Sequence, residues 1–154
     1  MATREDTRAT IWGSKVAELR DGAEHLIRAH TAEVGLGDPD AIRWNVLQEA
    51  EDEGNLAVLI ARVHGVDVGY LLVSFGPNIW DEARMLMDIM AVYVDPEWRG
   101  VGIMRRLVDR AEATGRSRGC TRAGASVPTS PDTAWGRFEH LGYVAGFVQM
   151  TKEL

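Results

Sequence analysis

The residue types best suited to bind an anion form one short run, which reads RGVGIM at positions 99–104. Gly100 and Gly102 have no Cβ atom, so their backbone can adopt conformations closed to other residues and can approach a ligand closely. The run follows a predicted strand at residues 85–94 and opens a predicted helix, whose first amides have no carbonyl partner and carry partial positive charge. Arg99 adds a fork of donors suited to phosphate oxygens. The run therefore predicts a site for a phosphorylated cofactor.

Known glycine loops differ from this run in their spacing. The phosphate loop of nucleotide hydrolases ends in Gly-Lys-Ser or Gly-Lys-Thr, whereas Ile103, Met104 and Arg105 follow Gly102, which excludes that loop. A dinucleotide fingerprint needs a third glycine where Arg105 stands, which disfavours it. A purely structural turn into an amphipathic helix stays as the alternative, because glycine-rich turns of this kind are common.

The composition fits one domain over residues 1–154 and argues against one class of partner. With 45% hydrophobic residues, a chain of 154 residues has enough material to bury roughly 70% of its unfolded surface. The formal net charge of -6 disfavours a nucleic-acid surface, which needs clustered lysine and arginine. An acidic protein suits an amine-bearing acceptor better.

Cys120 is the only cysteine, which excludes an internal disulfide and a cysteine-based metal cluster, and we predict no metal site. Residues 1–10 are polar and charged and lack the apolar centre of a signal peptide. No stretch approaches the roughly 18 apolar residues that span a bilayer. We therefore expect a cytoplasmic protein that does not enter a membrane.

Hydrophobic periodicity predicts the elements that position the glycine run. Apolar residues at helical spacing predict a helix over residues 19–34 that ends at Gly35, and a second helix from residue 38 to about residue 53. Two runs rich in β-branched and apolar residues, 56–63 and 66–75, flank His64 and Gly65 and predict a hairpin. The breakers at residues 76–78 predict a loop to about residue 84, before the strand at residues 85–94.

The rest of the chain predicts a helix, a strand, a helix and a strand. The first helix covers residues 102–115, and a short strand follows near residues 123–127. Ser130 is a suitable N-cap and Pro131 a suitable first helical residue, so the next helix covers residues 130–141 and stops at Gly142. Residues 143–151 form the last predicted strand.

Residues 93–104 resemble the central motif of the GCN5-related N-acetyltransferase (GNAT) superfamily, which reads Gln/Arg-x-x-Gly-x-Gly/Ala after a strand with a Val-x-Pro-like end. Arg99 and Gly102 match this motif, and Met104 stands where glycine or alanine is usual. Residues 138–143 are similar to the superfamily's Tyr-Glu-Lys-x-Gly-Phe run, and the likeness covers most of the chain. It implies an α/β fold with a central mixed, mostly antiparallel sheet, about four flanking helices and a splayed central strand, as in small stand-alone bacterial and phage members.

The resemblance also implies acetyl-CoA as cosubstrate. Backbone groups at the end of the bulged central strand would pair with the pantetheine arm, and amides of the glycine run would hold the diphosphate. The implied cofactor-binding residues are Val92, Tyr93, Val94, Arg99, Gly100, Val101, Gly102, Ile103, Met104 and Arg105. For Arg105, a solvated helix face is an equal alternative.

The implied activity is direct transfer of the acetyl group to a primary amine of a small molecule, or to a lysine or N-terminal amine of a peptide. A non-catalytic CoA-binding sensor or interaction module of the same fold is the alternative, because Phe138 stands where many relatives carry a tyrosine as the acid. Transfer of a longer acyl group is a third reading. Homodimers are frequent among such enzymes, and the oligomeric state stays open.

Asp88 is the candidate general base, which must take a proton because an alkyl amine is mostly ammonium at neutral pH. It lies eleven residues before Arg99, the spacing of the glutamate base in the histone-modifying branch of the superfamily. Strand alternation places it on the face of Met90 and Val92, and an apolar strand should raise its pKa. A hydrated or paired carboxylate is the alternative. His30 lies on the apolar side of the first helix and is interpreted as a core histidine.

Overall fold

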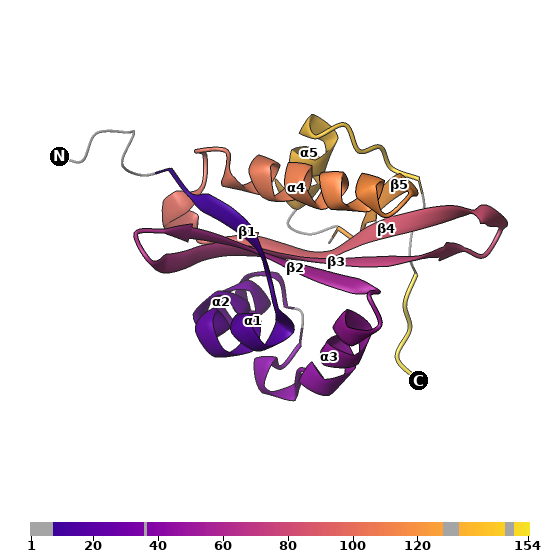
Figure 1. Cartoon of the computed structure of the whole chain (residues 1–154). Helices are drawn as coiled ribbons and strands as arrows, with labels where there is room; N and C mark the ends of the chain where they lie inside the picture. Colours follow the sequence, from indigo (N-terminus) through magenta and orange to yellow (C-terminus); the bar gives the residue numbers. More distant parts are fainter. Residues whose placement is uncertain (1–7, 36, 128–132, 147–149) are drawn as a thin grey trace.

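A five-stranded sheet in the order β1-β2-β3-β4-β5 separates two layers of helices in this computed structural model, which describes residues 8–35, 37–127, 133–146 and 150–154 (Figure 1). The strands are β1 (Thr10–Ser14), β2 (Leu56–Val63), β3 (Val66–Asn78), β4 (Asp81–Val94) and β5 (Cys120–Ala125). Neighbouring strands are antiparallel except β4 and β5, which are parallel. The predicted mixed, mostly antiparallel sheet is confirmed.

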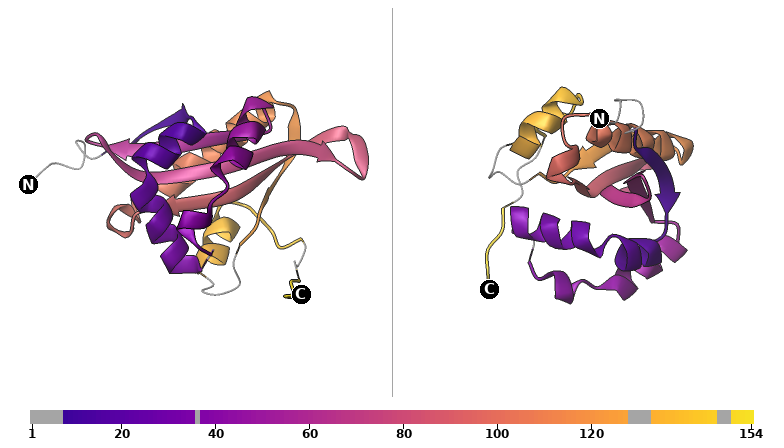
Figure 2. Two further views of the ribbon diagram at one scale, coloured as in Figure 1. Left: turned by 90° about the horizontal axis from the view of Figure 1, so that it is seen from below. Right: turned by 90° about the vertical axis from the view of Figure 1, so that its left-hand side faces the viewer.

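Helices cover both faces of the sheet (Figures 1 and 2). On one face lie α1 (Val16–Gly22), α2 (Glu24–Val34) and α3 (Trp44–Asp52), and on the other lie α4 (Ile103–Ser117) and α5 (Thr133–His140). Short 3-10 turns, η1 (Pro39–Ala41) and η2 (Pro96–Trp98), precede α3 and α4. The helix predicted over residues 19–34 is two helices, because the chain leaves helical geometry at Ala23. The preceding residue, Gly22, packs against the carboxylate of the buried Asp67.

Each face of the sheet has its own hydrophobic core. The α4 face buries apolar side chains of the central strands against the helix, among them Leu71, Val73, Ile89, Leu107 and Val108. The opposite face buries side chains against α1 and α2, among them Leu19, Leu26, Ile60, Tyr70 and Tyr93. Burial of apolar surface on both faces fixes the register of β3 and β4, and this register positions the site described below.

The hairpin predicted around His64 and Gly65 is confirmed. Both residues have positive φ angles, 48° and 79°, as a two-residue turn between twisted strands requires. The loop predicted at residues 76–84 is wrong, because β3 continues to Asn78 and β4 starts at Asp81. Pairing across the two long strands outweighs the local breaker residues Gly76 and Pro77.

Other boundaries also differ from the prediction. β1, a short edge strand that contains Gly13, was not predicted. Helix α4 continues past Gly115, because that glycine is buried against Met87 and serves close packing rather than termination. Residues 143–146 and 150–151 are not in a strand, which corrects the prediction for that part of the chain. Ser130 and Pro131 lie outside the described residues.

Candidate functional site

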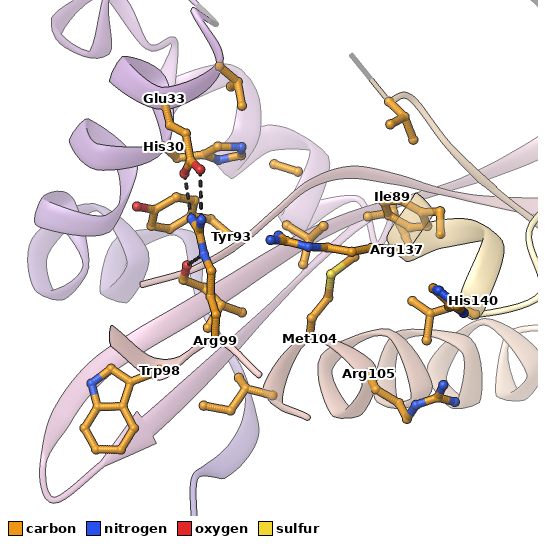
Figure 3. Close-up of a pocket in the computed structure, with 18 of the residues that line it drawn as sticks. His30, Glu33, Ile89, Tyr93, Trp98, Arg99, Met104, Arg105, Arg137 and His140 are labelled. Carbon is orange, nitrogen blue, oxygen red and sulfur yellow. Dashed lines mark hydrogen bonds and ion pairs between the residues drawn. The ribbon is translucent and has the colours of Figure 1, made fainter. Parts of the chain in front are cut away.

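A cavity of about 600 Å³ opens where the end of α2, the second half of β4, the start of α4 and α5 meet (Figure 3). Its lining residues come from segments 30–34, 89–94, 98–105, 126–127 and 137–141. Both helix layers therefore contribute, and the cavity has an α2 wall and an α4 wall on the two sides of β4.

Among the described residues, the part of strand β4 that lines this cavity has a partner strand on one edge only. The register between β3 and β4 shifts at Met90, which is an extra residue between the pairs of Val73 with Ile89 and Leu72 with Ala91. The pairing of β4 with β5 ends at Ile89, so one edge of residues 90–94 faces the cavity without a partner strand among the described residues. The bulge and splay implied by the resemblance are confirmed.

The glycine run forms the α4 wall. Gly100 and Gly102 have φ angles of 80° and 84°, the left-handed region that side chains disfavour, so both positions require glycine. Arg106 is the first residue of α4 whose amide bonds back, at 3.1 Å to the Gly102 carbonyl. Within the described residues the amides of 100–105 donate to no protein acceptor. These donors and the helix dipole together favour an anion.

The side chain of Arg99 does not point along the glycine run. Its Nη1 and Nη2 groups donate to the Glu33 carboxylate at 2.9 and 2.6 Å, and its Nε donates to the Val94 carbonyl at 2.8 Å (Figure 3). The guanidinium also lies over the Tyr93 ring, 5.3 Å from its centroid. A bidentate phosphate contact was predicted for Arg99, but the structure commits its fork to Glu33.

His30 forms part of the α2 wall and is 7% exposed. Its Nδ1 lies 2.6 Å from the Tyr70 hydroxyl, and its ring stacks on Tyr93 with centroids 5.0 Å apart. Burial lowers the pKa of His30 and raises the pKa of Tyr70, so both groups are neutral. We infer that the Tyr70 hydroxyl donates to Nδ1, which leaves the ring proton on Nε2. The core position predicted for His30 is confirmed, and this core position also borders the cavity.

Asp88 does not line the cavity, although the adjacent Ile89 does. Its neighbours Met87 and Ile89 face α4, so the Asp88 side chain belongs to the opposite face. The bulge at Met90 reverses the alternation, and Val92 packs on the α4 side, which corrects the predicted shared face of Asp88 and Val92. Burial raises the pKa of the Asp88 carboxyl, as its apolar strand predicted.

A family model described as the acetyltransferase (GNAT) family matches residues 20–143, which contain β4, the glycine run, α4 and α5. The chain belongs to the GNAT family. The resemblance stated from the sequence is thereby confirmed.

Solved structures share this GNAT fold across nearly the whole chain. A ribosomal-protein-alanine N-acetyltransferase from Brucella melitensis is 18% identical, with 96% of this chain and 100% of that chain covered and a TM-score of 0.76. An aminoglycoside acetyltransferase from an uncultured soil metagenomic sample is 19% identical, with 95% and 96% covered and a TM-score of 0.78. A transcriptional regulator from Bacillus halodurans is 22% identical, with 96% and 100% covered and a TM-score of 0.76. At identities this low, the structural similarity shows a shared fold and nothing further.

Helix α5 of this GNAT protein contributes residues that sequence reasoning missed. Arg137 and His140 line the cavity, with His140 next to Arg105 of α4 and the Arg137 side chain extending toward Tyr93 (Figure 3). No local pattern singled them out, because only the docking of α5 beside α4 brings them there. Phe138 is buried, packs edge-on against Tyr143 with ring centroids 5.2 Å apart, and has no proton to donate. Val101 is 63% exposed and does not line the cavity, although its neighbours Gly100 and Gly102 do.

Two further findings concern the described residues of this GNAT chain. No helix among them is long and apolar enough to cross a bilayer. No cluster of three or more histidine, cysteine, aspartate or glutamate side chains among them is arranged to hold a metal ion.

Proposed function

We propose that this chain is an acetyl-CoA-dependent N-acetyltransferase that moves the acetyl group directly to a primary amine. The observation that carries the proposal is the set of free amides at residues 100–105, at the N-terminus of α4 and next to the unpaired edge of β4. A diphosphate satisfies donors of this kind, and an extended chain with amide groups satisfies an open strand edge. CoA carries both groups in one molecule.

Each part of the cosubstrate has residues suited to hold it. Backbone groups of Val92, Tyr93 and Val94 would pair with the pantetheine arm, and the amides from Gly100 to Arg105 would hold the diphosphate. The Arg105 and Arg137 side chains line the same cavity and add positive charge. Arg99 supports the site through Glu33 rather than through the phosphates.

The proposed chemistry is attack of the amine on the thioester carbon. A C–N bond forms, the C–S bond breaks, and the sulfur leaves as a thiolate. Asp88 is the proposed base, and because it does not line the cavity we assign it to take the amine proton through one water. Phe138 cannot protonate the thiolate, which can leave unaided because the pKa of a thiol is within about two units of neutral.

The charged side chains that line the cavity favour one kind of amine acceptor over another. Glu33 is the one carboxylate among the described lining residues, and Arg99 already neutralises it, so these residues offer no free carboxylate to a second ammonium group. We therefore propose an acceptor with a single amine, such as a small monoamine or a peptide N-terminus, in preference to a polycation.

Two measurements on the purified chain test the proposal. Calorimetric titration with CoA should show saturable binding, and release of free thiol from acetyl-CoA should depend on an added amine. A non-catalytic CoA-binding module is the second candidate, favoured by the missing hydroxyl at Phe138. It predicts the same CoA binding with no amine-dependent thiol release. Absence of CoA binding would reject both.

A further inference from the structure

One ion pair joins the two walls of the cavity. Glu33, in the last turn of α2, and Arg99, directly after η2, are 66 residues apart in the sequence and share two hydrogen bonds, at 2.9 and 2.6 Å (Figure 3). The Arg99 side chain is 25% exposed and that of Glu33 is 40% exposed, so solvent screens the pair only in part. Arg99 lowers the pKa of Glu33, which keeps the carboxylate ionised.

The pair is anchored at both ends. Arg99 also donates from Nε to the Val94 carbonyl, the last residue of β4, and its amide donates to Pro96. One helical turn before Glu33, His30 stacks on Tyr93. The end of α2 therefore contacts the end of β4 in two ways. His30 stacks on Tyr93, and Glu33 binds Arg99, whose guanidinium lies over the same ring (Figure 3).

We propose that Glu33 and Arg99 are positioning residues that hold the glycine run in its binding conformation by fastening it to α2, and that Arg99 makes no direct contact with the phosphates. This inference rests on the proposed function, because it concerns the affinity of the chain for CoA.

Loop entropy is the physical reason for this role. Glycine loses more conformational freedom on ordering than any other residue, and residues 100–102 contain two glycines. A loop that is already fixed at its first residue loses less freedom when the diphosphate binds, so the affinity is higher. The Arg99 fork supplies this fixed point, because three of its N–H groups hold two different elements.

Glu33→Gln distinguishes a positioning role of Arg99 from a role as phosphate ligand, because the two roles predict opposite changes in CoA affinity. If the pair positions the loop, the variant should bind CoA about fivefold more weakly, with KM for acetyl-CoA raised and kcat little changed. If Arg99 is a phosphate ligand that Glu33 competes for, release from the carboxylate should tighten CoA binding, and tighter or unchanged binding overturns the proposal.

Glu24→Gln is the matched control. Glu24 begins the same helix and pairs with Arg28 at 2.9 Å, and neither residue lines the cavity. This control should leave the CoA affinity unchanged, although it also removes an ion pair made by a glutamate of α2. An equal loss of CoA affinity in both variants would mean that Glu33 acts only through the stability of α2, and would overturn the proposal.

Arg99→Lys and the double variant complete a cycle that does not depend on one substitution. Lysine keeps the charge but has no fork, so Arg99→Lys should lose about as much affinity as Glu33→Gln, and the double variant should lose little more. Full affinity in Arg99→Lys would overturn the proposal, and losses that simply add would assign Arg99 to the phosphates. If wild-type protein binds no CoA, the proposed function fails; if wild type binds and the cycle shows no coupling, only this inference fails.

Discussion

The two walls of the cavity are suited to recognise ligands by different means. The α4 wall presents backbone amides at residues 100–105, while the α2 wall presents the side chains of His30 and Glu33, each already bonded to a neighbour. Backbone donors survive most side-chain changes, whereas a side-chain wall changes with each substitution. A fold built this way can keep one cosubstrate while its acceptor varies.

The first test separates chemistry from cofactor binding, and its expected effect is the largest. Asp88→Asn should slow amine-dependent thiol release by about 100-fold or more, because general base catalysis contributes on that scale. CoA affinity should be unchanged, since Asp88 does not line the cavity. Thiol-release kinetics and calorimetry on the same sample measure the two effects. An unaltered rate would remove Asp88 as the base.

The second test targets the α4 wall. Gly102→Val forces a branched side chain into a φ of 84°, which costs about 1–3 kcal/mol and should weaken CoA binding about 10- to 100-fold as the amides move. Gly136→Ala in α5 is the control, because an added Cβ there meets no atom within 4 Å. The control should keep full affinity and gain a little helix stability. Equal CoA affinity in Gly102→Val would contradict the role of the run.

The third test targets the α2 wall through pH. Burial lowers the pKa of His30 in the folded protein below its usual 6.5, so the unfolded chain binds more protons between these two values. Stability from neutral His30 is complete above pH 6.5 and is lost as pH falls toward the folded pKa. Between pH 8 and pH 5, wild type should lose more unfolding free energy than His30→Gln. Parallel pH profiles in denaturant titrations would show that His30 is not buried as described.

The smallest effect is expected at Met104, where the side chain departs from the family motif. Met104→Ala removes atoms from the cavity lining but keeps the amide, so CoA affinity should change by no more than about twofold. A large change in calorimetric affinity would mean that the α4 wall also works through side chains, and would weaken the contrast between the walls.

Local signals were enough to predict the α4 wall. Glycines at positions 100 and 102 are needed for their positive φ angles, and the strand before them and the helix after them follow from periodicity. The bulge was implied by the family resemblance, but its place at Met90 depends on how β3 pairs with β4, and this place decides that Asp88 and Val92 lie on opposite faces. No local pattern carries that information.

The α2 wall could not be predicted because its contacts are distant in sequence. Glu33 meets Arg99 across 66 residues, and His30 meets Tyr70 across 40 residues. The same cause explains the wrong loop at residues 76–84, where the partner strand decides the structure and the local breakers do not. For His30 and Glu33, the sequence indicated only their positions on the predicted helix and not their contacts.

NMR spectra of the amide groups test the central claim most directly, that the amides of residues 100–105 hold the diphosphate of CoA. The ¹H–¹⁵N spectrum of the whole chain would be titrated with CoA and, separately, with pantetheine, which has no diphosphate. The account predicts that CoA shifts the amide signals of residues 100–105 strongly and that pantetheine leaves them near their free positions while it shifts those of residues 92–94. CoA binding that leaves the signals of residues 100–105 unmoved would contradict the account.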